Sequence, residues 1–369
     1  MTNAASPVGR AVTDVLARAV GNGIGSVVAV DGRAVGEQGD ERLVDRPGEG
    51  AVGEDALRWR RADIATPSVA DALAGADVVV HLAIPDDLEG ALFLDPHRRR
   101  TDAVRSAQAV LTAAAAVGAR HVVVVTSAMV FGARPDSPVP LPEDGPLEAV
   151  PDDGVVGDLL EVEQVVARVR ETYPGLAVTS LRPAAIVGPG VDTLTTRHFE
   201  APRLLAVRDA PTLWQFCHVD DLARAVLKVV QDGLTGQLTV GAPGTLTEDE
   251  VGRLSGMRRI DVPRNLAFGT AERLHRVGVL RTPATELNFV VHPWVVSSSR
   301  LTDAGWRAEY DNEQCLRVLL EQVTRRKAAT GRRIERSGTA LGAAGAAVAL
   351  VGTAAVWRQA KARQGRRRG

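Results

Sequence analysis

Lysine and tyrosine are scarce in this chain of 369 residues. Lysine occurs only at Lys228, Lys327 and Lys361, and tyrosine only at Tyr173 and Tyr310. Neither tyrosine is followed four residues later by a lysine. The sequence therefore excludes a site built on a Tyr-x-x-x-Lys pair, in which the lysine charge lowers the pKa of a tyrosine that transfers protons.

Cysteine is almost absent, with only Cys217 and Cys315, which excludes a disulfide framework and a cysteine-rich zinc site and favours a reducing compartment. The net charge of −1 predicts no nucleic-acid partner. Aromatic residues make up only 4% of the chain. No signal peptide is visible at the start, so we expect a cytoplasmic domain.

Apolar runs alternate with helix-like segments along the first two thirds of the chain. The runs predict buried strands of a parallel sheet, at 76–83, 121–126 and 177–181, with a further short strand at 238–240. The helical patterns lie at 10–20, 69–73, 101–117, 158–173 and 218–230. Residues 32–61 are polar and rich in Gly, which predicts a loop with short structure. This alternation indicates an α/β fold with a doubly wound parallel sheet.

The first 31 residues have the plan of a dinucleotide site. Small residues at Asn3, Ser6 and Gly9 form a predicted tight turn, a helix begins at about Pro7, and an apolar strand ends at Asp31. Such a turn lets the backbone approach a pyrophosphate, and an acid about 20 residues on binds a ribose hydroxyl. Asn and Ser stand where the usual pattern has glycine, which places more bulk at the turn.

The strand that should precede this turn is missing, since only Met1 and Thr2 stand before it. The first strand of a doubly wound sheet lies in its middle. We therefore expect a gap there, and a natural start upstream of Met1.

Seven stretches, in this order, resemble the extended short-chain dehydrogenase/reductase superfamily, and within it the NAD-dependent epimerase/dehydratase family. They are residues 2–9, Val30-Asp31, Asp63-Ile64, residues 79–83, residues 126–132, residues 181–183 with 187–190, and residues 216–223. The resemblance implies a nucleotide sugar or similar polar substrate, a smaller C-terminal substrate domain, a possible homodimer, and NAD as the cofactor. NADP is less favoured because the carboxylate of Asp31 repels a 2′-phosphate.

The resemblance also implies the roles of single residues. Ser6 and Gly9 line the pyrophosphate, Asp31 binds the adenosine ribose, and Ser127 is the catalytic serine. The remaining cofactor contacts are Asp63 and Ile64 at the adenine, Leu82 and Ala83 in the cleft, and Pro183 near the nicotinamide.

The family's catalytic tyrosine and lysine fall at Val155 and Leu159, neither of which can move a proton. Two hypotheses stay open. The protein is an enzyme with a non-standard base, for which Asp152, Asp153 and Asp158 are the nearest carboxylates, or it is a catalytically inactive sensor or scaffold that binds NAD or a ligand at a membrane.

Histidines offer weaker alternatives. His218, with Asp220 and Asp221, reads as a helix cap rather than as a metal site, and no metal is expected. His81, at a strand end, and His292 are expected to be packed rather than catalytic.

The chain divides by pattern into three parts. A Rossmann domain spans 1–190, to which 210–242 returns, and 191–209 with 243–326 forms the substrate region. Residues 327–369 form a basic-flanked tail around an uncharged stretch at 338–357, long enough for an apolar transmembrane helix. An interfacial helix is the alternative, and either one predicts membrane association.

Overall fold

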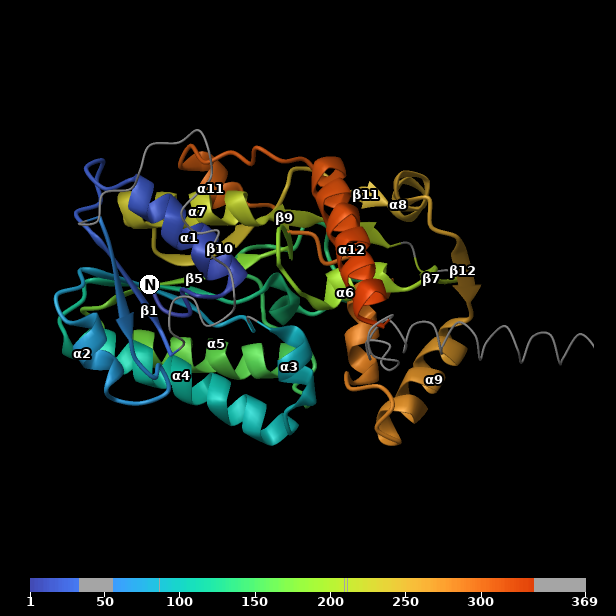
Figure 1. Cartoon of the computed structure of the whole chain (residues 1–369), viewed down its shortest axis with the longest axis horizontal. Coiled ribbons are helices and arrows are strands. Elements are labelled where there is room, and N and C mark those ends of the chain that lie inside the picture. Colours follow the sequence, from blue (N-terminus) through green and yellow to red (C-terminus); the bar gives the residue numbers. More distant parts are fainter. Residues whose placement is uncertain (33–55, 86, 209, 211, 335–369) are drawn as a thin grey trace, which may run out of the picture.

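A computed structural model describes residues 1–32, 56–85, 87–208, 210 and 212–334. A parallel sheet forms its centre, and helices cover both faces (Figure 1). Helices α1 (Pro7–Arg18) and α7 (Val219–Asp232) lie side by side on one face. The other face is covered by α2 (Val69–Leu73), α4 (Pro96–Ala116) and α5 (Val155–Thr172). This confirms the predicted α/β fold.

The strands of this sheet are short. They are β1 (Val27–Asp31), β2 (Leu57–Arg61), β3 (Val78–Leu82), β4 (His121–Val125), β5 (Ala177–Pro183) and β10 (Gly236–Val240). Three of them, β1, β3 and β4, are chiefly apolar. Every residue of β4 is buried. Val123 and Val125 belong to the core on the α1 side, whereas Val122 and Val124 belong to the core under α4 and α5. Burial on both faces explains why the strand has no polar alternation.

Met1 and Thr2 lie between β1 and β3 in the sheet, where we expected a gap. Thr2 forms parallel bridges to Val30 of β1 and to His81 of β3. Its amide donates to the oxygen of Val80 at 2.9 Å, and the amide of Val30 donates to the oxygen of Met1 at 2.7 Å. The expected gap is therefore bridged by a single residue, and the strand order is β2, β1, Thr2, β3, β4, β5, β10.

The turn after Thr2 keeps its predicted shape without two of the expected glycines. Asn3 has a φ of 55°, a conformation that Asn tolerates better than most residues. Its side-chain amide donates to the oxygen of Leu82 at 2.6 Å. Ser6 caps α1 by accepting from the amide of Gly9 at 2.9 Å, and α1 starts at Pro7 as predicted.

Most predicted strands and helices differ from the observed ones at one or both ends. The helix predicted at 101–117 starts five residues earlier, because Asp95 accepts from the amide of Arg98 and caps α4. The helix predicted at 158–173 starts at Val155. The loop predicted for 32–61 contains β2, which pairs with β1; residues 33–55 lie outside the described part.

The remaining elements lie mostly beyond the carboxyl ends of the main strands. Three small strand pairs occur there: β6 (Ala185–Val187) with β9 (Phe216–His218), β7 (Leu204–Val207) with β12 (Arg259–Val262), and β8 (Leu213–Trp214) with β11 (Leu246–Thr247). The α-helices are α3 (Leu88–Phe93), α6 (Leu194–Glu200), α8 (Glu248–Ser255), α9 (Arg264–Arg276), α10 (Asn288–Val291), α11 (Ser299–Asp303) and α12 (Asn312–Ile334). Two 3-10 helices are η2 (Ala128–Phe131) and η3 (Ala284–Leu287).

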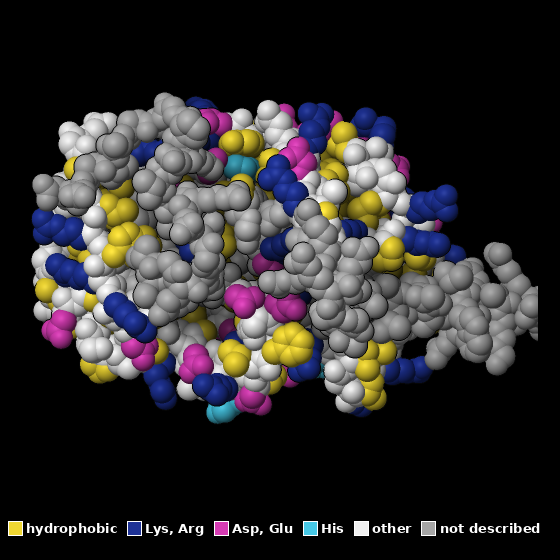
Figure 2. Space-filling model, viewed as in Figure 1, with side chains coloured by type: hydrophobic (Ala, Val, Ile, Leu, Met, Phe, Trp, Pro, Cys, Tyr) yellow, Lys and Arg dark blue, Asp and Glu magenta, His cyan; other side chains and the backbone are white. Residues whose placement is uncertain are grey.

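Both cysteines are buried free thiols, Cys217 in β9 and Cys315 in α12. Burial raises the pKa of both thiols, that of Cys315 to about 12. On the described part of the face shown in Figure 2, Lys and Arg side chains are interspersed with Asp and Glu.

Among the described helices, none is both long and apolar enough to cross a bilayer. The stretch at 338–357, for which a membrane helix is predicted, lies outside the described residues. The division at residue 190 into two domains stays a prediction.

We predict that Gly9→Ala destabilises the fold by about 3 kcal/mol, near the upper end of overpacking costs. A Cβ at Gly9 would lie 2.1 Å from the backbone oxygen of Asn3 and 2.8 Å from the Cα of Ala4. The matched control is Gly252→Ala in α8, where a Cβ meets nothing within 4 Å. Urea unfolding measures both, and equal midpoints for the two variants would show that the turn is not this tight.

A second prediction concerns stability below pH 7. Burial, with the nearby terminal amine as a second cause, lowers the pKa of His81 from 6.5 to about 4. Between these values the unfolded chain binds a proton that the folded chain does not, so acid favours unfolding. We expect His81 to account for a loss of up to about 3 kcal/mol as the pH falls from 6.5 to 4.

Urea unfolding of wild type and His81→Gln at pH 7.5 and pH 4.5 measures this contribution. The buried imidazole of His198 and the amine of Met1 also have pKa values lowered by burial, so the slope should shrink rather than vanish. His97→Gln, at an exposed position of α4, is the control. If His81→Gln keeps the wild-type pH dependence, the imidazole is already charged in the folded chain.

Candidate active-site cavity

A cavity opens where the carboxyl ends of β4 and β5 face the start of α1. It encloses about 760 Å³, counting the space open to solvent. Its lining is chiefly apolar and comes from six stretches of the chain and one further residue, namely Ser6, Pro7, Val8, Ile84, Pro85, Leu88, Thr126, Ser127, Met129, Val155, Val156, Leu159, Ala184, Ala185, Ile186, residues 191–195 and Trp294. Ligands of open α/β sheets bind at this edge, and the volume suits a small molecule.

Ser127, Val155 and Leu159 all line this cavity. Val155 is the first residue of α5, and Leu159 lies one helical turn further along the same face. The two side chains are only 5% and 4% exposed. The positions assigned to the tyrosine and the lysine therefore line the same cavity as the predicted serine, but carry aliphatic side chains.

The hydroxyl of Ser127 is engaged by its own chain. It caps η2 by accepting from the amide of Met129 at 3.2 Å. The hydroxyl still has a proton to donate, so Ser127 can offer one hydrogen bond to a bound molecule. Without a basic partner it is a hydrogen-bond donor rather than a nucleophile.

A buried ion pair supports the cavity floor behind Ser127. Thr126 donates to Glu163 at 2.6 Å, and Glu163 forms hydrogen bonds of 2.9 Å with the guanidinium of Arg182. Burial alone would raise the pKa of Glu163, but Arg182, Thr126 and Ser180 hold it below its ordinary value. Glu163 is thus an anion whose oxygens are all engaged, and it fixes the strand end that carries Ser127.

The predicted cofactor residues are gathered at the same edge, but only part of them line the cavity. Ser6 does so, and Gly9 packs beneath it. Asp31 ends β1 and is 4% exposed, and its carboxylate accepts from the amide of Ala5 at 3.0 Å. This bond joins the strand end to the turn, as a shared dinucleotide site requires.

The other predicted residues lie further from the cavity. Asp63 forms a tight turn by accepting from the amide of Ala65, and Ile64 packs against the core under α4 and α5. Leu82 is fully buried. The cavity is lined by the residues that follow two predicted positions: Ile84 and Pro85 after Ala83, and residues 184–186 after Pro183.

The carboxylates considered as alternative bases serve structural roles. Asp158 is buried and accepts from Arg99 at 2.5 Å and from Arg100 at 3.1 Å. Asp152 accepts from Thr285, and Asp153 lies 3.8 Å from His275. None of the three is among the described residues that line the cavity.

Sequence reasoning missed Glu286 of η3. Its carboxyl accepts from the amide of Val155 at 3.0 Å and so caps α5, which Gly154 cannot do. Burial, reinforced by the charge of Asp152, raises the pKa of Glu286 to about 8. The two partners are 131 residues apart, so no local sequence pattern predicts this cap.

His218 acts as the N-cap of α7, the place predicted for Asp220 or Asp221. Its ring accepts from the amide of Asp220 at 3.2 Å and stacks on Tyr310 at 3.7 Å. Within the described part of the chain, no group of three potential ligands could hold a metal ion.

The start of α1 fits a dinucleotide, with one restriction. The left-handed Asn3 and the close contact at Gly9 keep the compact turn that lets a pyrophosphate approach. However, Pro7 has no amide proton, and the amide of Gly9 donates to Ser6. Among the first three residues of α1, this leaves the amide of Val8 to donate a hydrogen bond to an anion.

Comparison with known proteins agrees with this geometry. Residues 4–241 match the model of the NAD dependent epimerase/dehydratase family. An uncharacterized protein of Mycobacterium tuberculosis is 27% identical over 208 residues, covering 55% of this chain and 54% of that protein. The 3-diazoavenalumate denitrifying reductase of a Streptomyces species is 32% identical over 223 residues, covering 54% of this chain and 67% of the reductase. The chain thus spans about half the length of the mycobacterial relatives it matches.

Solved structures share the fold at low identity. DesIV, a dTDP-glucose 4,6-dehydratase of Streptomyces venezuelae solved with NAD, is 19% identical with a TM-score of 0.64, over 89% of this chain and 97% of that one. MoeE5, solved with UDP-glucuronic acid and NAD, is 21% identical with a TM-score of 0.60, over 88% and 98%. Both support the Rossmann-type architecture.

Proposed function

This chain belongs to the NAD dependent epimerase/dehydratase family, and from that premise we propose that it binds NAD together with an apolar small molecule beside Ser127. We further propose that it does not carry out proton-coupled oxidation of a sugar hydroxyl. One observation carries the proposal: Val155 and Leu159, at the positions of the tyrosine and lysine, line the cavity with Ser127.

NAD would lie along the sheet edge from Asp31 to the cavity. Asp31 would accept from the adenosine ribose, the amide of Val8 would meet the pyrophosphate, and Pro183 would lie near the nicotinamide. Asp63, Ile64, Leu82 and Ala83 would surround the adenine half. The carboxylate of Asp31 disfavours NADP. The bound cofactor would supply or accept a hydride.

The residues of this chain then limit the reaction. Removing hydride from an alcohol requires a base for the hydroxyl proton, and the described cavity lining holds no Tyr, Lys or His. Reduction of an electrophile that needs no proton from the protein escapes this limit. The name of the Streptomyces relative, a denitrifying reductase acting on a diazo compound, favours this form of the proposal.

A second candidate is a sensor that binds NAD and a ligand without turnover. The loss of the proton-transfer pair favours it equally, and the two differ in whether hydride moves. A nucleotide sugar, the substrate class implied by the family resemblance, suits the apolar lining less well than an apolar ligand does, because sugar hydroxyls need polar partners.

NAD binding is tested by calorimetry on wild type and Asp31→Asn, which removes the charge but can still accept from Ala5. We expect the variant to bind NAD about tenfold more weakly, because a hydrogen bond to a charged group contributes on the order of 1.5–3 kcal/mol. Asp71→Asn, on the far helix α2, is the control. Equal affinities would remove Asp31 from the site.

Chemistry is tested in the same preparation in two directions, with NAD+ and UDP-glucose carrying deuterium at C4 of the glucose ring, and with NADH carrying deuterium at the transferable position. We expect no deuterium transfer from UDP-glucose to NAD+, and binding of the neutral fluorescent probe N-phenyl-1-naphthylamine. Transfer to an aryl diazonium would favour the reductase over the sensor. Turnover of UDP-glucose at about 1 s⁻¹ or faster, a typical enzyme rate, would refute the proposal.

We also propose that residues 338–357 and their basic flanks hold the protein at a membrane. The full chain should sediment together with vesicles that contain anionic lipid, whereas a chain that ends at Arg336 should stay in the supernatant. High salt should release a surface-bound helix, since the screening length falls to about 3 Å at 1 M, but not a spanning one. A full chain that stays in the supernatant at low salt would exclude both modes.

A further inference from the structure

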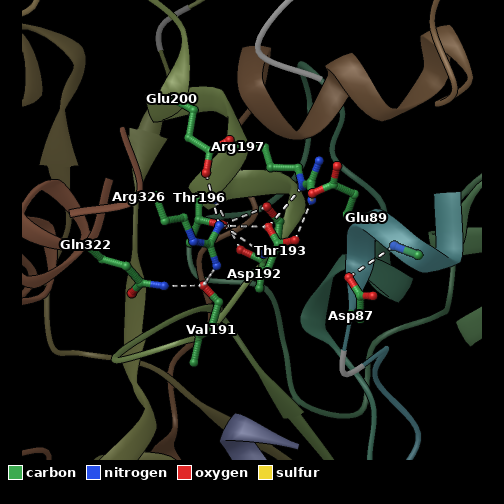
Figure 3. A network of polar contacts seen from close by, with 11 residues as sticks. Asp87, Glu89, Val191, Asp192, Thr193, Thr196, Arg197, Glu200, Gln322 and Arg326 are labelled. Atoms are coloured by element: carbon green, nitrogen blue, oxygen red, sulfur yellow. Dashed lines mark hydrogen bonds and ion pairs between the residues drawn. The ribbon is translucent and has the colours of Figure 1, made fainter. Parts of the chain in front are cut away.

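One wall of the cavity carries a charged cluster formed by Glu89, Asp192, Arg197, Glu200 and Arg326 (Figure 3). Asp192 lines the cavity, and its side chain is only 11% exposed. Its carboxylate accepts from Arg197 at 2.9 and 2.5 Å and from Arg326 at 3.2 Å. One carboxylate of the cavity wall therefore engages two guanidinium groups.

Both arginines have a further acidic partner. Arg197 lies 3.6 Å from Glu89, and Arg326 lies 3.0 Å from Glu200. The charged cluster thus contains three carboxylates and two guanidinium groups, which leaves a net charge of −1. Burial alone would lower the pKa of Arg197, but its acidic partners raise it. The guanidinium is held in its charged form by this cluster.

The same wall is fixed to α12. The side-chain amide of Gln322 donates to the oxygen of Val191 at 2.7 Å, and Arg326 donates to the same oxygen at 3.1 Å. Thr193 and Thr196 form a capping box at the start of α6. The segment at 191–196 is therefore held from both sides, and Arg197 and Arg326 cannot turn toward a ligand without breaking their contacts with Asp192.

We propose that Asp192, the member of this cluster that lines the cavity, sets its ligand class, because it neutralises the two arginines behind this wall, whose charge would otherwise attract a phosphate. The cavity then admits uncharged apolar molecules and rejects the diphosphate of a nucleotide sugar. A diphosphate would face a net negative cluster and an apolar wall, where its charge is costly to desolvate. This inference rests on the proposed function and narrows its substrate class.

The test measures UDP binding to the full chain at low salt with NAD at saturation, so that the nucleotide does not compete at the cofactor site. The variant D192N/E200Q removes two negative charges and brings the cluster to +1. We expect UDP to bind at least tenfold more tightly to it than to wild type, because opposite charges attract strongly near low-dielectric walls. The affinity for N-phenyl-1-naphthylamine should stay within about threefold.

Two controls separate charge from structure. E313Q neutralises a carboxylate of α12 that pairs with Arg317 and should leave UDP binding at the wild-type level. D192E keeps the charge and should also behave as wild type, with melting temperatures reporting folding. If wild type binds UDP as tightly as D192N/E200Q, or if E313Q gives the same gain, the inference is wrong. Failure to bind NAD would instead overturn the proposed function, and UDP titration without NAD would still test Asp192.

Discussion

The backbone pairing of Thr2 between two strands is the constraint on which the rest of the molecule depends. This one residue joins β1 with β2 to the other four strands of the sheet. It also fixes where Asn3 turns and hence where α1 begins, at the edge where the cavity opens. Parallel strands gain stability only when both faces are covered. Helices cover both faces of the sheet, but its two parts are joined at Thr2 by very few backbone hydrogen bonds.

The sequence predicted the features that depend on local pattern. Buried strands such as β4 follow from continuous apolar runs, and the start of α1 follows from Ser6 and Pro7. The features that it did not predict depend on residues far apart in the chain. Glu286 caps α5 across 131 residues, and Arg326 reaches Asp192 across 134. A periodicity argument considers neighbours within one element, so such contacts are outside its reach.

Under the proposed function, the residues that hold the strand end and the turn in place are kept, whereas the pair that would transfer a proton is replaced. Glu163 and Arg182 still brace the strand end that presents Ser127, and Asp31 still joins the turn to β1. On this proposal, the buried Val155 and Leu159 stand where the proton-transfer pair would be and offer no group that can move a proton. Removing one partner of a buried ion pair is strongly destabilising. Substituting Glu163 or Arg182 therefore costs the fold more stability than substituting Val155 or Leu159.

The two cysteines have a practical consequence. Both thiols are buried, and their raised pKa values keep them in the unreactive protonated form. The folded chain therefore behaves toward maleimides and spin labels as though it had no cysteine. New cysteines at two exposed helix positions can be labelled selectively without first replacing the native ones, which opens the protein to measurements of the distance between those two positions.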